Sequence, residues 1–249
     1  MLGRKHCQAL AHAGARVVVA DLDQGQASSL ANSLGDNHMG VALNVANEYS
    51  IREAKDLVLK KYETIDVLVN NAAINDMFES PQLKEEQSRF ENYPLAMWQQ
   101  ALEVNVTGVF LCSQIIGSVL ADKGQGSIIN IASTYGITAP DQTLYQDEKG
   151  RQTFNKSAAY PTTKGAVISF TRFLAAYWGN KGVRVNSLSP GGVRNGQEDY
   201  FISNYSKRTP LGRMADATDY QGAVVFLASD ASLYMTGANL VVDGGWTII

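Results

Sequence analysis

Short runs of β-branched and apolar residues alternate with longer amphipathic stretches along the whole chain. The runs predicted to be strands are Arg16–Ala20, Met39–Asn44, Ile65–Asn70, Ser127–Ile131, Val183–Leu188 and Asn239–Val242. The stretches predicted to be helices are Arg4–His12, Gln24–Ser33, Ser50–Lys61, Leu95–Leu120, Ser157–Trp178 and Ala217–Ala228. Such alternation is typical of a parallel sheet with helices on both faces, whose strands are apolar without a period of two. The sequence therefore predicts an α/β fold with a doubly wound parallel sheet.

The composition is that of a globular protein with one sizeable core, because 45% of the 249 residues are hydrophobic and 18% are charged. We interpret residues 1–249 as one domain, since no linker or repeat divides them. A formal net charge of -3 gives no electrostatic reason to expect a nucleic acid or a membrane as partner, so small molecules are favoured. No apolar run approaches the roughly 20 residues that span a bilayer, and no signal-peptide order is found. The sequence predicts a cytoplasmic protein.

The cysteines and histidines do not form a metal-binding pattern. Cys7 and Cys112 lie in predicted helices without a nearby partner, so we interpret them as reduced packing residues. His6 and His12 are six residues apart and face different sides of one helix, and His38 lies far along the chain. We therefore predict no metal site.

Tyr160 and Lys164 stand four residues apart at the start of a predicted helix and so share one face. A free phenol has a pKa near 10 and exchanges protons poorly at neutral pH, unless an ammonium within ~4 to 6 Å favours the phenolate. Ser157 is predicted to cap this helix, and Pro161 falls in its first turn, where a missing N–H does least harm. The pair suits acid/base chemistry, although the same spacing is common on solvated helix faces.

Further polar residues follow the predicted strands at their carboxyl ends. Asn70–Ala73 follows the third strand, Ser133 the fourth and Pro190–Gly191 the fifth, while Asn105 lies in the long helical stretch. In open α/β sheets the carboxyl edge is where ligands bind. The arrangement therefore predicts a binding site at that edge.

In this order, these residues resemble the short-chain dehydrogenase/reductase family. The resemblance covers nearly the whole chain, including Thr236–Gly237 and Val242–Gly245 near its end. It implies a single-domain, Rossmann-like fold and an oxidoreductase that moves a hydride between a nicotinamide ring and an alcohol or carbonyl.

The resemblance also implies a role for each residue of the predicted catalytic set. Tyr160 would exchange a proton with the substrate oxygen, and Lys164 would lower the pKa of Tyr160 and hold the nicotinamide ribose. Ser133 would orient the substrate oxygen. Asn105 would seat a water molecule that connects Lys164 to solvent, with a purely structural role in bending or capping its helix as the alternative.

The choice of cofactor rests mainly on Asp21, which ends an apolar strand. A carboxylate there accepts hydrogen bonds from the ribose hydroxyls of NAD and repels the 2′-phosphate of NADP, so NAD is favoured over NADP. The alternative is an Asp that serves only as a turn residue. The other cofactor-binding positions implied by the resemblance are Gly3, Asn44, Val45, Asn71, Ala72, Ala73, Pro190, Gly191 and Val193, together with Tyr160 and Lys164.

The beginning of the chain departs from the family pattern, because Met1-Leu2-Gly3 runs directly into helical sequence. Asp21 follows Gly3 by 18 residues, close to the ~20 that separate a glycine-rich turn from the ribose-binding acid. We therefore interpret Gly3 as the last glycine of that turn and expect the first strand to be missing. In the family's order this strand lies between the strands that end at Asp21 and Asn70, so we expect exposed strand edges, weak cofactor binding and a longer working protein.

A second departure is the interval of 27 residues between Ser133 and Tyr160, about twice that common in the family. We expect the stretches 76–94 and 141–156 to be surface excursions that shape a polar substrate pocket. Thr134–Gly136 and Ser189–Gly192 resemble a subgroup tied to bacterial surface-sugar and flagellin modification. A sugar or sugar-derived alcohol is therefore the favoured substrate.

Two other functions stay open at this point. One is an NADP-dependent reductase of 3-oxoacyl or steroid-like substrates, and the other is a catalytically silent relative acting as a scaffold or regulatory subunit. The family resemblance also implies a homodimer or homotetramer joined through the helices predicted over Leu95–Leu120 and Ser157–Trp178 and through the C-terminal strand.

Overall fold

A four-stranded parallel sheet forms the centre of the molecule in the computed structural model, which describes residues 1–75 and 85–249. Its strands lie in the order β3 (Val67–Asn70), β4 (Gly126–Ile131), β5 (Val183–Pro190) and β6 (Asn239–Val242). β4 and β5 are almost fully buried. Their Ile, Val and Leu side chains pack with helices on both faces, and their buried Ser and Asn side chains form hydrogen bonds. The predicted α/β class with parallel strands is confirmed.

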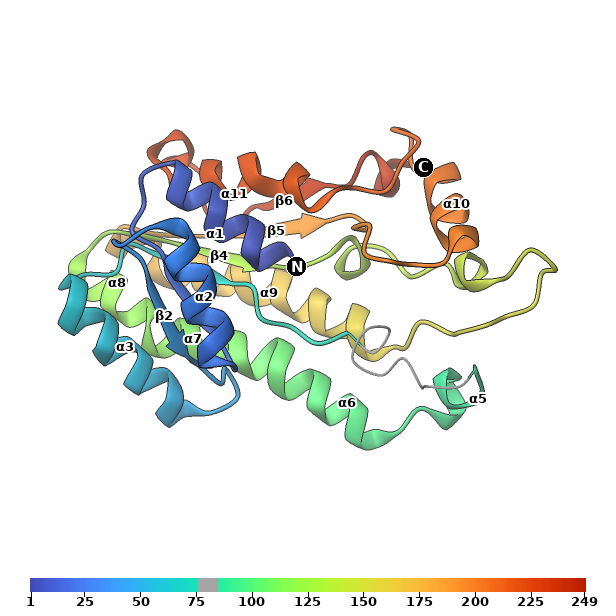
Figure 1. Ribbon diagram of the computed structural model, residues 1–249, viewed down its shortest axis with the longest axis horizontal. Coiled ribbons are helices and arrows are strands. Elements are labelled where there is room, and N and C mark those ends of the chain that lie inside the picture. Colours follow the sequence, from blue (N-terminus) through green and yellow to red (C-terminus); the bar gives the residue numbers. More distant parts are fainter. Residues whose placement is uncertain (76–84) are drawn as a thin grey trace.

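A separate pair of parallel strands, β1 (Val18–Asp21) and β2 (Met39–Ala42), continues the fold beyond β3 (Figure 1). Among the described residues, no hydrogen-bonded ladder joins β1 to β3, so the strands form two sheets. The sequence predicts an interruption at this place, between the strands that end at Asp21 and Asn70.

Helices cover both faces of the central sheet (Figure 1). On one face, Ala9 of the first helix and Val224 and Leu227 of α11 pack with Ile129 and Leu188 of the sheet. On the other face, Leu174 and Trp178 of α9 pack with Ile128 and Val185, together with Leu120. Within residues 1–75 and 85–249, the α-helices are α1 (Leu2–His12), α2 (Gln24–Leu34), α3 (Glu48–Tyr62), α5 (Glu85–Ser88), α6 (Leu95–Leu102), α7 (Gly108–Ile115), α8 (Gly117–Lys123), α9 (Ala159–Trp178), α10 (Asp199–Lys207) and α11 (Gln221–Ala228).

The prediction of one continuous helix over Leu95–Leu120 is wrong in detail. A π-helical segment, Glu103–Thr107, separates α6 from α7, and α8 follows α7 after a further break. Asn105 lies inside the π segment, and its side-chain amide hydrogen-bonds Ile74, which lies outside the helix. Single π-helical turns within α-helices are frequent at functional sites.

The prediction that no apolar run is long enough to cross a membrane is wrong for this helical region. By length and composition alone, Leu95–Lys123 meets that criterion. Half of its most apolar stretch is buried inside the protein, as in a helix that packs in a core. The predicted location in the cytoplasm stays a prediction.

Three further differences follow from hydrogen bonding and packing. α9 begins at Ala159 with Ala158 at its N-cap and no side-chain cap, so the prediction that Ser157 caps it is wrong. The segment 217–220 is a 3₁₀ helix that leads into α11. α10 was not predicted; it forms because Phe201 and Tyr205 share a buried face four residues apart.

Candidate functional site

Tyr160 and Lys164 lie on one face of the first turns of α9, as their spacing predicts. The Nζ atom of Lys164 is 5.6 Å from the centre of the Tyr160 ring. Tyr160 is half-buried, whereas the Lys164 side chain is only 3% exposed. The pair therefore places an ammonium beside a phenol that substrate can reach.

The end of β4 fixes the position of Lys164. Its Nζ atom donates a hydrogen bond of 2.7 Å to the carbonyl oxygen of Ile131, the last residue of that strand. Burial lowers the pKa of Lys164 to about 8, because the charged form loses its hydration. Gly136 is needed nearby, since a Cβ atom there would lie 2.7 Å from the backbone of Lys164.

Ser133 is buried two residues beyond the end of β4. Its Oγ atom accepts a hydrogen bond of 3.2 Å from the backbone N–H of Tyr135 at the start of a short 3₁₀ helix. The hydroxyl hydrogen can still donate to an oxygen atom that enters the site. Because Ile131 holds Lys164 and Ser133 follows Ile131 by two residues, β4 and α9 bring these groups to one edge of the sheet.

Asn105 joins three segments through its buried amide. The Oδ1 atom accepts a hydrogen bond of 2.8 Å from the backbone of Ile74, and Nδ2 donates to the Ile74 carbonyl oxygen and to Thr163 Oγ1. Thr163 precedes Lys164, so Asn105 connects the end of β3, the π segment and α9. This arrangement fits a structural role; a water molecule between Asn105 and Lys164 stays a prediction.

Three of the predicted cofactor-binding residues, Asp21, Asn44 and Val45, lie at or just beyond the carboxyl ends of β1 and β2. Asp21 is exposed, and its Oδ1 atom accepts a hydrogen bond of 3.1 Å from the backbone of Asp23. Asn44 is also exposed, and its Oδ1 atom accepts from the backbone of Ala46. Val45 contacts Gly108, where a Cβ atom would lie 2.8 Å from the valine side chain. Both polar side chains retain oxygen atoms that a ligand can reach.

Gly3 lies at the start of α1 against Asn71, which directly follows β3. A Cβ atom on Gly3 would lie 2.8 Å from Nδ2 of Asn71, so a larger residue would displace this side chain. Ala72 and Ala73 continue from Asn71 toward Ile74. The structure thus brings Gly3 and the segment 71–73 together, although they are far apart in the sequence.

The residues after β5 complete the carboxyl edge. The backbone N–H of Gly191 donates to the carbonyl oxygen of Val242 in β6, and a Cβ atom on Gly191 would lie 2.9 Å from Asp243. Pro190 is the last residue of β5, and Val193 forms an isolated bridge with Ala215. Close backbone packing therefore fixes this turn.

These residues fit a dinucleotide. The N-terminus of α1 has no side-chain cap and no acidic residue in its first turn, so its N–H groups can bind an anion such as a pyrophosphate. Asp21 offers a carboxylate to ribose hydroxyls at the end of β1, and Lys164 offers a cation at the end of β4. The fit is to an extended ligand that runs along the carboxyl ends of the strands.

The segment 141–156 was expected to be a polar surface excursion, and that prediction is wrong for its interior. Leu144 and Tyr145 are buried, and they pack with Phe201, Tyr205 and Trp246 in one aromatic cluster. Lys156, a residue not predicted for the site, is buried beside Tyr160. The aromatic residues of the segment were the available signal, since solvated loops do not need them. The other expected excursion, 76–94, lies partly outside the described residues.

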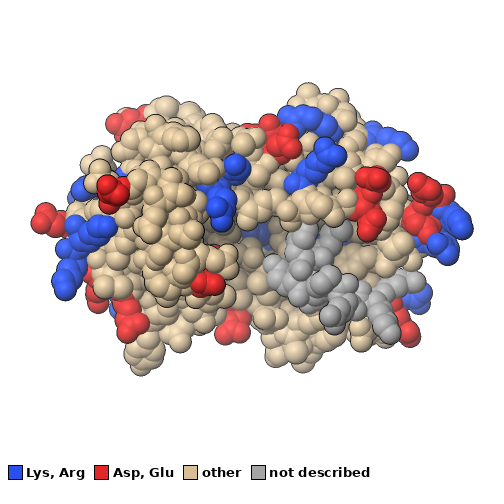
Figure 2. All heavy atoms as spheres, in the orientation of Figure 1, with Lys and Arg blue, Asp and Glu red and all other residues tan. Residues whose placement is uncertain are grey.

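Charged side chains of both signs are scattered over the face drawn in Figure 2, with no extended area of one sign. Within the described residues, no group of three His, Cys, Asp or Glu side chains gathers as metal ligands do. The two cysteines are free, and burial raises the pKa of the Cys112 thiol to about 12, as in an inert packing residue.

The fold and the residues at the carboxyl edge of its parallel sheet define a class of protein. This class is the Rossmann-like α/β proteins, which bind ligands at the carboxyl ends of parallel strands. Residues 2–247 match the protein family described as Enoyl-(Acyl carrier protein) reductase. The chain is 34% identical to a D-threitol dehydrogenase of Mycolicibacterium smegmatis over 99% of its own length and 89% of that protein. It is also 34% identical to a 3-alpha-(or 20-beta)-hydroxysteroid dehydrogenase of Mycobacterium tuberculosis, over 98% and 84%. The chain therefore belongs to the short-chain dehydrogenase/reductase family and is an oxidoreductase.

Solved structures of the same family have the same fold. A gluconate 5-dehydrogenase from Burkholderia cenocepacia, in complex with NADP and tartrate, superposes with a TM-score of 0.86 at 30% identity, covering 100% of this chain and 92% of that one. A short-chain dehydrogenase from Leptospira borgpetersenii with bound NAD+ superposes with a TM-score of 0.85 at 32% identity, covering 99% and 88%. These likenesses confirm the Rossmann-like fold.

Proposed function

We propose that this protein is an NAD-dependent dehydrogenase of a secondary alcohol on a polyol or sugar-derived substrate. The observation that carries the proposal is the group of Tyr160, Lys164 and Ser133 at the carboxyl end of β4. The proposed unit is the whole chain, residues 1–249, acting as one domain.

The proposed chemistry divides between the cofactor and three side chains. The nicotinamide ring supplies the site that accepts or gives up the hydride. In the oxidation direction, the oxygen of Tyr160 takes the proton from the alcohol hydroxyl, and in reduction it returns a proton to the carbonyl oxygen. The ammonium of Lys164 favours the phenolate form of Tyr160, and Ser133 donates a hydrogen bond to the same substrate oxygen.

Support for a nicotinamide cofactor comes from the solved relatives, of which one holds NADP and another NAD+. The preference for NAD rests on Asp21, because its carboxylate would repel a 2′-phosphate. The other proposed contacts are Gly3, Asn44, Val45, Asn71, Ala72, Ala73, Pro190, Gly191 and Val193, together with Tyr160 and Lys164.

Support for the substrate class comes from names of relatives, which act on D-threitol and gluconate. The hydroxysteroid relative favours the alternative of a bulky apolar substrate. A panel that contains threitol, other polyols, sugar acids and a hydroxysteroid distinguishes the two classes directly.

The test compares the wild type with Tyr160→Phe, with NAD titrated to saturation and binding followed by fluorescence. We expect both proteins to bind NAD equally, and only the wild type to oxidise an alcohol of the panel. Equal turnover by both proteins would eliminate the proton transfer. Binding without turnover of any substrate by the wild type would favour the scaffold alternative.

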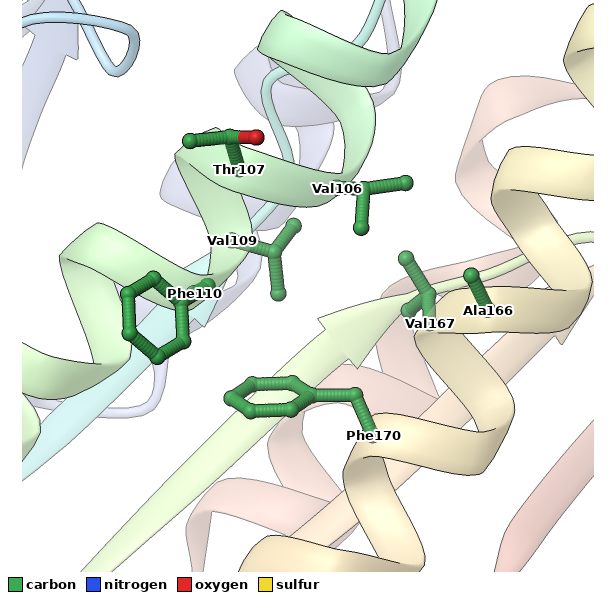
Figure 3. A pocket seen from close by; sticks show the side chains of 7 residues that line it. All are labelled: Val106, Thr107, Val109, Phe110, Ala166, Val167 and Phe170. Carbon is green, nitrogen blue, oxygen red and sulfur yellow. The ribbon is translucent and has the colours of Figure 1, made fainter.

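We also propose that a second copy of the chain covers the outer face of α7 and α9. Phe110, Phe170, Phe173 and Tyr177 form a ladder of ring contacts along this face, and Phe173 is 62% exposed. Val109 and Phe110 of α7 and Val167 and Phe170 of α9 line an apolar pocket of about 280 Å³ between the helices (Figure 3). Exposed apolar surface of this kind marks an interaction site.

Light scattering after size exclusion tests this association. We expect a dimer or tetramer for the wild type and a smaller species for Phe173→Glu. Tyr49→Glu is the matched control, because Tyr49 is exposed in the first turn of α3 and lies off this face. A monomeric wild type would contradict the proposal.

A further inference from the structure

A second ammonium lies beside the Tyr160 ring and comes from outside α9. The Nζ atom of Lys156 is 4.5 Å from the centre of the ring, nearer than Nζ of Lys164 at 5.6 Å. Lys156 is only 5% exposed, and its Nζ atom donates a hydrogen bond to Oδ1 of Asn75. Burial of a lysine beside a titratable ring is uncommon, because lysine side chains normally keep their charge in water.

The backbone of Lys156 is held in place by one side chain from the start of the same segment. Gln142 accepts a hydrogen bond of 2.8 Å from the Lys156 N–H and donates one of 3.0 Å to its carbonyl oxygen. Gln152 donates to the carbonyl oxygen of Gln142, which closes the segment on itself. Leu144 and Tyr145 anchor it in the aromatic cluster. The long interval before Tyr160 thus delivers a fixed ammonium to the phenol.

We propose that Lys156 is a positioning residue that works with Lys164 to hold Tyr160 acidic, so that proton exchange depends on two lysines from two elements. This inference rests on the proposed role of Tyr160 as the proton-exchanging group. Three titratable groups are seen to act on the Tyr160 phenol, namely Lys156, Lys164 of α9 and Tyr145 of the segment 142–145. Tyr145 hydrogen-bonds Tyr135 and is a neutral phenol at physiological pH, because burial holds its pKa well above the usual value, whereas each lysine brings a positive charge to the ring.

The sign of the expected effect follows from electrostatics. A cation near the ring favours the phenolate, so its removal moves the titration midpoint of Tyr160 to higher pH. An opposite charge within ~4 to 6 Å shifts a midpoint by about one unit or more. Oxidation needs the phenolate, and therefore the pH profile of kcat/KM for oxidation should move upward by the same amount.

The experiment measures the Tyr160 phenol directly in the full chain, by NMR of protein with ¹³Cζ-labelled tyrosine. The Tyr160 resonance is the one that disappears in Tyr160→Phe. We expect Lys156→Met to raise the midpoint by about one unit and Lys156→Arg to leave it nearly unchanged. Lys149→Met is the matched control, since it removes an exposed lysine from the same segment and should have no effect. Thermal unfolding of each variant confirms that it is folded.

The outcomes separate this inference from the proposed function. A shifted midpoint in Lys156→Met supports the inference even if no alcohol of the panel is turned over, which would count against the proposed function alone. An unshifted midpoint in a folded Lys156→Met overturns the inference, whatever the activity. If that variant raises only KM for one substrate and leaves the pH profile in place, Lys156 contacts substrate instead, and the inference is wrong. Should Lys156→Met fail to fold, Lys156→Arg provides the test. A shifted Tyr160 midpoint in that variant would overturn the inference, because arginine keeps the positive charge.

Discussion

The two sheets of this protein carry their functional groups in opposite environments. Lys164 and Ser133 are buried at the carboxyl edge of the four-stranded sheet. Lys164 is fixed by a hydrogen bond to Ile131, and Ser133 by one from Tyr135. The β1–β2 pair offers Asp21 in an exposed position, and a small core of Val17, Val19 and residues of α1 and α2 supports it. Proton chemistry needs a low dielectric and fixed geometry, whereas selection between two cofactors needs only a charge at the right place. The comparison predicts that changes in the first region alter both stability and rate, and changes in the second alter selectivity alone.

The largest effect is expected for Lys164→Met. Turnover should fall by about 10²-fold or more, because Tyr160 loses one of the two cations that favour its phenolate. The loss appears in kcat at saturating alcohol and NAD. Retention of at least half the wild-type kcat would contradict the role given to the buried region.

The same variant should be more stable at pH 7. The pKa of Lys164 is lowered from 10.5 to about 8, so the unfolded chain holds this proton more tightly than the folded protein does. The resulting reduction of the unfolding free energy, about 3 kcal/mol, is fully present below pH 8. It disappears as the pH rises toward 10.5. Lys164→Met removes this cost but leaves the Ile131 carbonyl unpaired, which costs about 1 to 3 kcal/mol.

We therefore expect a net gain of about 1 kcal/mol in the unfolding free energy at pH 7, measured by urea denaturation. The wild type should gain stability relative to the variant as the pH rises from 8 to 10. A gap between them that does not change with pH would mean that Lys164 carries no such penalty.

Ser133→Ala is expected to lower kcat/KM by about 10-fold to 100-fold, since one hydrogen bond to the substrate oxygen is lost in the transition state. Ser133 Oγ also accepts from the backbone of Tyr135, so the unfolding free energy should fall by about 1 kcal/mol. Ser133→Thr restores a hydroxyl and serves as the control. A change in KM for NAD without a change in kcat would place Ser133 away from the reacting oxygen.

Asp21→Asn tests the exposed region. We expect the ratio of kcat/KM for NAD over that for NADP to fall by about tenfold, because the repulsion of a 2′-phosphate is removed. Stability should stay within about 0.5 kcal/mol, as for other exposed positions. Asp36→Asn is the control, since it removes an exposed carboxylate beyond α2. An equal change in both variants would assign the effect to net charge.

The smallest effect is expected for Glu48→Gln, which breaks the exposed pair between Glu48 and Arg52 in α3. Such pairs contribute about 0.3 to 0.5 kcal/mol, so the melting temperature should fall only slightly and kinetics should not change. A loss above about 1 kcal/mol would show that the region near β2 depends on its surface charges more than its small core suggests.

Several features of this protein could be predicted from sequence because they depend on local periodicity. The apolar runs identified the six strands found in the described residues, although β1 begins at Val18 and the N–H of Val17 donates to His38 instead. The spacing of Tyr160 and Lys164 fixed their shared helix face, since four residues make about one turn. The interruption of the helix predicted over Leu95–Leu120 could not be foreseen, because the π segment depends on hydrogen bonds between Asn105 and the distant residues Ile74 and Thr163.

The sequence by itself determined the alternation of strands and helices, the family and the residues proposed for proton exchange, since each is written in spacing along the chain. Only the tertiary structure decided that Gly3 meets Asn71, that Ile131 holds Lys164, and that Lys156 reaches the ring of Tyr160. Those contacts join segments distant in sequence or pass through a long connection without a period. Their formation depends on burial and on complementary hydrogen bonds, which no local pattern encodes.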